Sequence, residues 1–154
     1  MAAIAALLSQ IPLLSNLGPD QLSAVERICE RCLFTAGQTV VREGEEADAA
    51  YFLIDGPIEC ITRSPTDETI STPIPSGATL LELALIVEID VTATCIARGS
   101  AKVLRIPRKA MLCLMEEDAE LTNDIIATLT ARLHEMSETM REVSSVFEDA
   151  RLSA

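Results

Sequence analysis

The hydrophobic positions of this chain change their spacing twice, which divides the sequence into three regions. From Ile4 to Cys32, apolar side chains recur three or four positions apart, the period of an α-helix. Over residues 33–106, short runs rich in Val, Ile and Thr are separated by Gly, Pro and Asp, which is typical of strands and turns. From Pro107 the pattern is helical again. We therefore expect one domain with N-terminal helices over 1–32, β structure over 33–106 and C-terminal helices over 107–154.

The middle region is expected to contain many short strands, each followed by a turn signal such as Asp55-Gly56. Such strands at even spacing are typical of antiparallel sandwiches and rolls. The sequence therefore predicts an α+β fold, an antiparallel β-roll of jelly-roll (double-stranded β-helix) type with N-terminal helices and a long C-terminal helix. The expected strands are Leu33–Phe34, Thr39–Arg42, Ala50–Asp55, Ile58–Arg63, Thr69–Pro73, Thr92–Arg98 and Ala101–Ile106.

The last helix, expected to run from about residue 119 to Arg151, carries a narrow apolar stripe in an otherwise polar segment. Its members follow alternating steps of three and four, the a and d pattern of a coiled coil. A narrow stripe fits a partner helix better than a broad core, so we predict a parallel homodimer through this helix. The alternative is that the stripe packs on the roll of its own chain. The predicted interface consists of Ile126, Leu129, Leu133, Met136, Met140, Val143 and Phe147.

Charge narrows the possible partners. Twelve basic residues stand against twenty-four acidic ones, for a net charge of −12. Such a surface repels phosphate backbones and anionic lipid, so neither direct nucleic-acid binding nor membrane binding is expected. From the sequence we expect no signal peptide, no membrane-spanning stretch and a soluble, cytoplasmic protein. The five cysteines form an odd set without a disulfide framework, which also favours a reducing compartment.

Three stretches carry the candidate chemistry. The first is Ile11 to Leu17, the second runs from Ala36 to Gly56 with glycines at the expected turns, and the third is Gly77 to Ala97 with Leu81-Glu-Leu-Ala-Leu85 at its centre. Together they resemble the cyclic-nucleotide-binding domain family, the regulatory domain of catabolite-activator-like proteins, here without a helix-turn-helix part. The resemblance implies a regulatory β-roll that has no enzymatic activity.

In that family a short helical turn presents backbone N–H groups to a cyclic phosphate, a Glu binds the ribose hydroxyl and an Arg pairs with the phosphate. By this resemblance Glu82 keeps the acidic position, whereas Leu81 replaces a tight glycine and Val91 replaces the arginine. The long helix of the family offers a hydroxyl to the base at the position of Ser137. The candidate ligand-binding residues are Glu82, Leu83, Ala84, Val91, Thr92 and Ser137.

The valine at position 91, where the family has arginine, determines whether we expect cyclic-nucleotide binding. Without the arginine, a bound phosphate loses its counter-charge, which costs roughly 2–5 kcal/mol, and the neighbouring Glu88 and Asp90 repel an anion further. We therefore predict little or no cyclic AMP binding and no cofactor. The expected function is that of a homodimeric signalling module with a degenerate cassette, which acts through a protein partner.

Two alternatives remain open. The chain is a sensor of cyclic AMP or another small nucleotide or metabolite in the same pocket, or it is a thiol-based redox sensor that uses Cys29 and Cys32. A zinc site or iron–sulfur cluster needs about four ligands, which this pair does not supply. We expect Cys29, Cys32, Cys95 and Cys113 to be buried as small apolar side chains. The sequence indicates no catalytic residue and no metal site.

Overall fold

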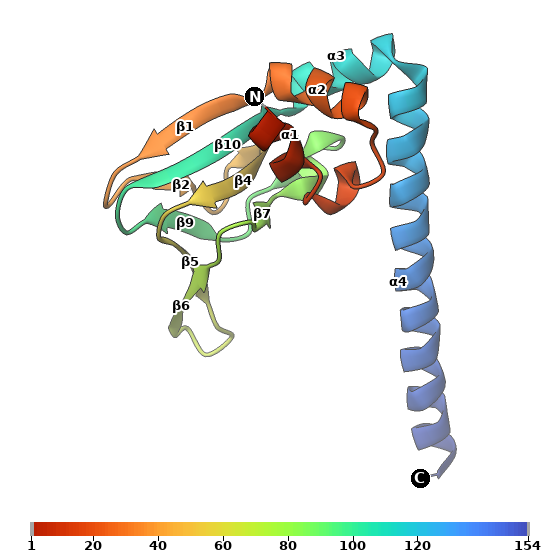
Figure 1. Ribbon diagram of the computed structural model, residues 1–154. Helices are drawn as coiled ribbons and strands as arrows, with labels where there is room; N and C mark the ends of the chain where they lie inside the picture. The colour runs from red at the N-terminus through yellow and green to blue at the C-terminus, as the bar shows by residue number, and fades with distance from the viewer. Residues whose placement is uncertain (1, 154) are drawn as a thin grey trace.

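In the computed structural model the backbone is described for residues 2–153, and side chains are described for residues 4–135, 137 and 138. The chain forms an α+β roll with helices at both ends of the sequence, as the pattern of apolar positions predicts (Figure 1). No helix in the described part of the chain is long and apolar enough to cross a bilayer. The helical elements are α1 (Ala2–Leu8), η1 (Pro12–Leu14), α2 (Pro19–Ile28), η2 (Glu82–Leu85), α3 (Arg108–Glu117) and α4 (Ala119–Ser153).

The strands form two antiparallel four-stranded sheets, ordered β1-β10-β4-β7 and β2-β9-β5-β6, and a short pair, β3-β8. Each expected strand is present within a few residues of its expected bounds. The two-residue strands β3, β7 and β8 were not expected, because two residues are too few to show an alternating pattern. The strands are β1 (Glu30–Phe34), β2 (Thr39–Val41), β3 (Glu46–Ala47), β4 (Ala49–Asp55), β5 (Ile58–Arg63), β6 (Thr69–Ile74), β7 (Thr79–Leu80), β8 (Ile89–Asp90), β9 (Thr94–Ala97) and β10 (Ala101–Pro107).

The end of the N-terminal helical region is the main difference from the expected elements. Helix α2 starts with Pro19 at its first position, and the Gly18 N–H donates to Gln21 Oε1 at 2.8 Å. The helix ends at Ile28, because Cys29 is extended and Glu30–Phe34 pairs with β10 as strand β1. The expectation that Cys32 is helical is therefore wrong. Its spacing from Cys29 fits a helix, but pairing with β10 outweighs that local preference.

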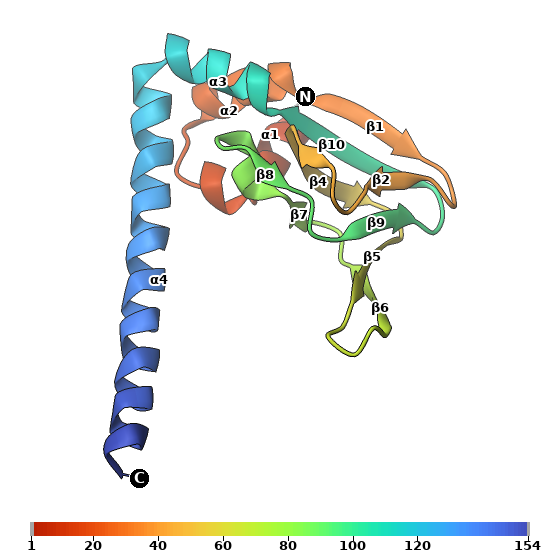
Figure 2. The ribbon, with the colours of Figure 1, turned by 180° about the vertical axis from the view of Figure 1, so that it is seen from behind.

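Two aliphatic clusters hold the fold together. One lies inside the roll, between the two sheets, and includes Val41, Leu53, Val91 and Val103. The other lies where α1, η1, α2, α3 and the start of α4 cover the opposite side of the β1-β10-β4 sheet. Seen from behind, β8 and the turn after β7 lie on the side of the roll that faces α4 (Figure 2). This arrangement places the candidate cassette between the roll and the long helix.

The cysteines differ from expectation in two respects. Cys60 in β5 and Cys95 in β9 face each other in register and form a disulfide, with 4.2 Å between their Cα atoms. Their sequence separation of 35 gives no sign of this pairing, which only the sheet register creates. The expectation of cysteines without a disulfide is therefore wrong. The cysteines no longer support the expectation of a reducing compartment. Cys113 is exposed on α3 rather than buried, and Cys29 and Cys32 are only partly buried.

Gly56, at the turn between β4 and β5, is required both by its backbone and by its neighbours. The φ of Gly56 is +112°, a backbone conformation that residues with a side chain rarely adopt. A Cβ there would lie 2.4 Å from both the Ala101 Cα and the Ser100 carbonyl oxygen. Gly44 also has a positive φ, of +88°, but an added Cβ would meet nothing within 4 Å.

Gly56→Ala is expected to lower the free energy of unfolding by about 3 kcal/mol or more, because backbone strain and backbone overlap act together. Gly44→Ala is the matched control and should cost only about 1 kcal/mol, from strain alone. Urea denaturation of both variants measures the difference. Equal losses would show that the close approach at Ala101 does not constrain the turn.

Candidate functional site

The cassette begins with a left-handed residue. Leu81, directly before η2, has φ 58° and ψ 43°. The family motif has glycine at this position. The sharp turn is therefore present here, although leucine takes the place of glycine. A left-handed leucine costs roughly 1–2 kcal/mol. The side chain of Leu81 packs partly against the cluster inside the roll, and this burial offsets the strain.

Glu82 follows this turn and is engaged by two other elements. Its side chain is only 12% exposed. The Leu13 N–H in η1 donates to Glu82 Oε2 at 3.2 Å, and Arg132 on α4 forms an ion pair with Glu82 Oε1. Both carboxylate oxygens therefore have partners within the chain. The residue that was expected to bind a ribose hydroxyl instead connects the cassette to the N-terminal segment and to the long helix.

Val91, at the position where the motif expects arginine, is packed into the roll. It is 5% exposed and belongs to the interior cluster. Its backbone is held by the turn after β2, because the Val91 N–H donates to the Glu45 carbonyl at 2.8 Å and the Gly44 N–H donates to the Val91 carbonyl at 2.9 Å. Beside Val91 and Leu81 lies a cavity of about 160 Å³. Sites for small molecules are usually 300–1,000 Å³.

The charged groups at this cavity do not favour an anion. Arg42 lines it together with Glu45, Glu46 and Asp48. Two further arginines stand nearby, and each is already engaged: Arg105 by Asp48 and Glu30, and Arg108 by Glu46 and by the carbonyls of Ala47 and Val87.

The pKa of Arg105 reflects its hydrogen bonds to neighbouring side chains. Burial by itself lowers the pKa of Arg105, but hydrogen bonds to Glu30, Tyr51 and Asp48 outweigh it and raise the pKa above its usual range. Arg105 and Arg108 therefore act as structural clamps between strands, and a phosphate in the cavity could recruit them only by breaking existing ion pairs.

A second, more open cleft lies on the other side of the cassette. It has a volume of about 390 Å³ and is lined by Gln10, Thr79, Glu82 and Arg132, with Pro12 and Gly77. Four of these six residues are polar, and the cleft is bounded by η1, the cassette and α4. Glu82 lies here, whereas Leu81 and Val91 line the smaller cavity.

The structure brings together only part of the candidate set. Glu82, Leu83 and Ala84 share η2, with Leu83 42% exposed and Ala84 buried. Val91 is buried and Thr92 is exposed at the approach to β9. Ser137 is exposed on α4 and does not line either cavity.

The apolar stripe of α4 is described only in its first half. Ile126 and Leu133 are 50% and 56% exposed, whereas Leu129 is half-buried against the helical cluster. Of the three stripe residues whose side chains are described, Leu129 alone packs on its own chain. The remaining predicted interface residues, Met136, Met140, Val143 and Phe147, lie outside the residues whose side chains are described.

Cys29 and Cys32 do not have the character of reactive thiols. Burial, with a smaller contribution from Glu26, raises the pKa of Cys29 to about 12, and the Cys29 thiol donates to the Val25 carbonyl at 3.2 Å. Burial and Glu30 also raise the pKa of Cys32, against a lowering effect of Arg105. Because the thiolate is the reactive form, these shifts reduce nucleophilicity near neutral pH. In the described part of the chain no group of three or more His, Cys, Asp or Glu residues could hold a metal.

Sequence reasoning missed the role of Arg132. In the helical pattern it is only a flanking position of the stripe. The available signal was Glu82 itself, because an acid within the apolar run from Leu80 to Val87 needs a partner when buried. The sequence offers twelve basic residues for that role, and only the packing of α4 selects one.

Comparison with known proteins agrees with this geometry. The sequence model of the cyclic nucleotide-binding domain matches residues 31–118, more than half of the chain. The cAMP-dependent protein kinase regulatory subunit of Aspergillus fumigatus is 30% identical over 106 residues, which are 67% of this chain and 24% of that protein. Lysophospholipase nte1 of the same fungus is 25% identical over 134 residues, 86% of this chain but 9% of that protein. The chain thus spans less than a quarter of each of these relatives.

Among solved structures, the N-terminal domain of a transcriptional regulator from Streptomyces coelicolor A3(2) superposes with a TM-score of 0.80 at 20% identity, over 87% of this chain and 94% of that domain. At this identity the likeness concerns the fold. With the left-handed turn, the cassette helix and the roll in their expected places, the match over residues 31–118 establishes that the chain belongs to the cyclic nucleotide-binding domain family.

Proposed function

We propose that this chain is a homodimeric, non-enzymatic regulatory module whose cassette no longer binds cyclic nucleotides with useful affinity, and which acts through a protein partner. The observation that carries the proposal is the buried Val91 at the arginine position, beside a cavity of about 160 Å³. The net charge of −12 supports a protein partner rather than nucleic acid or membrane. The cytoplasm remains the expected location.

The energetics of anion binding support the loss of affinity. A phosphate in the cavity would lack the arginine of the motif, at a cost of roughly 2–5 kcal/mol, which is about 30- to several-thousand-fold in affinity. Arg42, which lines the cavity, stands beside the three acids Glu45, Glu46 and Asp48. In addition, both carboxylate oxygens of Glu82, which would accept from the ribose hydroxyl, already contact Arg132 and the Leu13 N–H. Both main polar contacts of a cyclic nucleotide are thus weakened, for independent reasons.

The ion pair between Glu82 and Arg132 supports a regulatory role without a ligand. It joins the cassette directly to α4, so a partner that moves α4 also acts on the cassette, and the reverse holds by linkage. The exposed Ile126 and Leu133 support self-association, because an α4 from a second copy would cover them.

The second candidate function is that of a sensor for a small polar metabolite. It is favoured by the cleft of about 390 Å³ beside Glu82, where Gln10, Thr79 and Arg132 converge. A ligand there would compete with the Glu82–Arg132 ion pair and so reach α4. This candidate differs from the first in requiring saturable binding of a small molecule.

The unmodified chain is expected to bind cyclic AMP and cyclic GMP with a Kd weaker than about 1 mM in calorimetric titration. The double variant Leu81→Gly with Val91→Arg restores the motif and should strengthen cyclic AMP binding by about 30-fold or more, because the phosphate regains its counter-charge. The matched control, Leu81→Gly with Val91→Met, adds length without charge and should bind no better. Micromolar binding by the unmodified chain would refute the proposal.

The coupling between Glu82 and Arg132 can be measured by a double-mutant cycle with Glu82→Gln and Arg132→Gln. We expect a coupling energy of about 1 kcal/mol, because Glu82 is mostly buried while Arg132 is 42% exposed and partly screened by water. The exposed pair Glu59 and Arg98, at 36% and 45% exposure, is the control and should couple far more weakly. A coupling no larger than that of the control would remove the proposed connection.

The proposed dimer is tested by Leu133→Glu, which places a charge in the stripe of α4. Sedimentation velocity should show a shift from dimer to monomer, because facing carboxylates repel each other and the apolar contact is lost. Ala131→Glu adds the same charge at an exposed position on the other side of α4 and should leave the dimer intact. A Leu133→Glu variant that remains dimeric at micromolar concentration contradicts this interface.

A further inference from the structure

The outer face of the β1-β10-β4 sheet is covered by helices along only part of its length. Phe52 in β4 and Leu104 in β10 lie in register and are fully buried beneath the helical cover. Two residues further along β4, Ile54 is only half-buried, and Leu33 in β1 is 65% exposed. The sheet therefore presents an aliphatic strip that the helices do not reach.

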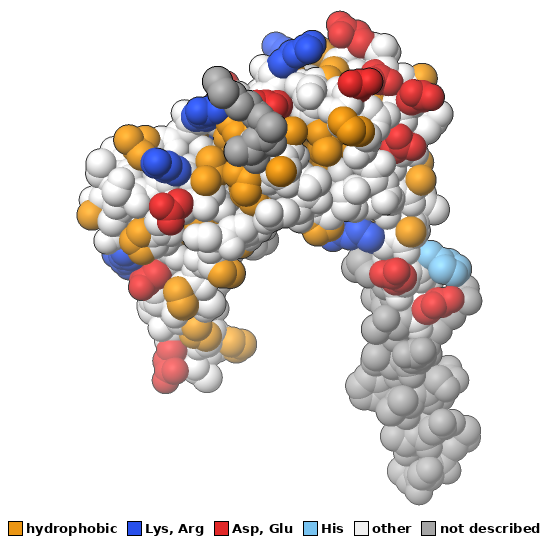
Figure 3. Space-filling view, viewed as in Figure 1, with side chains coloured by type: hydrophobic (Ala, Val, Ile, Leu, Met, Phe, Trp, Pro, Cys, Tyr) orange, Lys and Arg blue, Asp and Glu red, His pale blue; other side chains and the backbone are white. Residues whose placement is uncertain are grey.

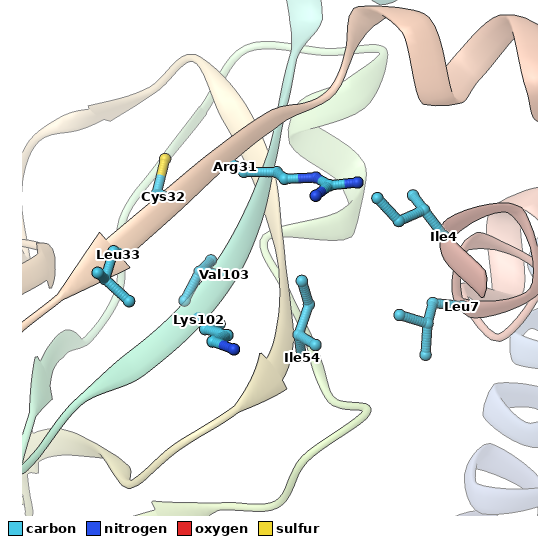
Figure 4. A pocket seen from close by; sticks show the side chains of 8 residues that line it. All are labelled: Ile4, Leu7, Arg31, Cys32, Leu33, Ile54, Lys102 and Val103. Atoms are coloured by element: carbon cyan, nitrogen blue, oxygen red, sulfur yellow. The ribbon is translucent and has the colours of Figure 1, made fainter. Parts of the chain in front are cut away.

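This strip and helix α1 enclose a groove of about 560 Å³. Ile4 and Leu7 point from α1 toward the sheet, and Ile54 faces them (Figure 4). Leu33 adds to this apolar lining, and Cys32 and Val103, whose side chains pack in the cluster inside the roll, border the groove as well. None of the described lining residues is aromatic. The space-filling view shows hydrophobic side chains gathered on this face, with basic side chains along one side (Figure 3).

Two cations, Arg31 and Lys102, complete the lining. Neither forms an ion pair with any described residue, and Asp55, which lies opposite Lys102 in the strand register, makes none with it. None of the described residues that line the groove is acidic, although the chain has twice as many acids as bases. An aliphatic groove with two unpaired cations is complementary to an anion that carries an apolar tail.

We propose that this groove binds a small anionic amphiphile, a single aliphatic chain with a carboxylate head. Its volume lies within the usual 300–1,000 Å³ of small-molecule sites. A protein partner would need about 800 Å² on each side, whereas Leu33 is the only strongly exposed large hydrophobic residue among those that line the groove. The aliphatic strip holds the chain, and Arg31 and Lys102 hold the carboxylate.

The groove lies on the outer face of the sheet and shares no lining residue with the cavity at Val91 or with the cleft at Glu82. The proposal is therefore independent of the cassette and of the dimer helix. Either can fail while the other stands.

Octanoate is the probe, added to the full chain and followed by amide shifts in two-dimensional NMR. We expect saturable shifts centred on Leu33, Ile54 and Val103. Octylamine, with the same chain and the opposite charge, should bind at least tenfold more weakly, because the cations repel it. Affinity should rise about two- to fourfold for each methylene from hexanoate to decanoate, as expected for an apolar groove.

Variants identify the site. Arg31→Gln and Lys102→Gln should each weaken octanoate about two- to fivefold, and Leu33→Asp should weaken it at least tenfold, through lost apolar contact and added repulsion. Lys109→Gln on α3 and Ile70→Asp on β6 alter exposed positions away from the groove and should leave the affinity unchanged. Retained amide dispersion in Leu33→Asp confirms that the fold is intact.

Four results would overturn the proposal. These are the absence of saturable shifts at groove amides, equal binding of octanoate and octylamine, unchanged affinity in Leu33→Asp, and dissociation of a dimer by Leu33→Asp. The last result would assign the groove to a second copy of the chain.

Discussion

The left-handed backbone at Leu81 determines how the cassette faces the rest of the molecule. Because the chain reverses there, Leu81 turns into the roll while Glu82 turns outward, toward η1 and α4. The turn lies directly before η2, the element whose Glu82 contacts the long helix. A leucine can hold the turn because burial of its side chain offsets strain that a glycine would not have.

In the family motif the residues of the cassette form one site. Here they lie at two separate cavities, on either side of the turn at Leu81. The apolar half, with Leu81 and Val91, is closed and small. The polar half, with Glu82 and Arg132, is open and bounded by α4. A nucleotide normally needs both a cation for its phosphate and an acceptor for its ribose. By the resemblance to the family motif, Val91 stands at the position of the cation, and both carboxylate oxygens of Glu82 contact other parts of the chain.

Three arginines connect distant parts of the described chain. Arg105, Arg108 and Arg132 each join segments far apart in the sequence through acids or carbonyls. Since acids outnumber bases two to one, cations that remain unpaired are notable. Arg31 and Lys102 are such cations, and they lie where the helical cover of the sheet ends.

The sequence by itself determined the class of fold, because the change of apolar period from helix to strand and back is a local property of the chain. It also predicted where the cassette lies, with valine at the position of the arginine, and it placed glycines at turns, since each depends on residue type at a fixed spacing. Four of these glycines have a positive φ. It erred at Cys32, where strand pairing outweighed a helical spacing.

Only the tertiary structure decided which distant residues meet. The disulfide between Cys60 and Cys95, the ion pair between Glu82 and Arg132 and the groove beneath α1 all join segments whose proximity depends on register and packing. No local pattern encodes such contacts, because a cysteine or an acid can meet any partner that the fold brings near. The valine at the position of the motif's arginine could therefore be read from the sequence. The contacts of Glu82 with the Leu13 N–H and Arg132 could be learned only from the structure.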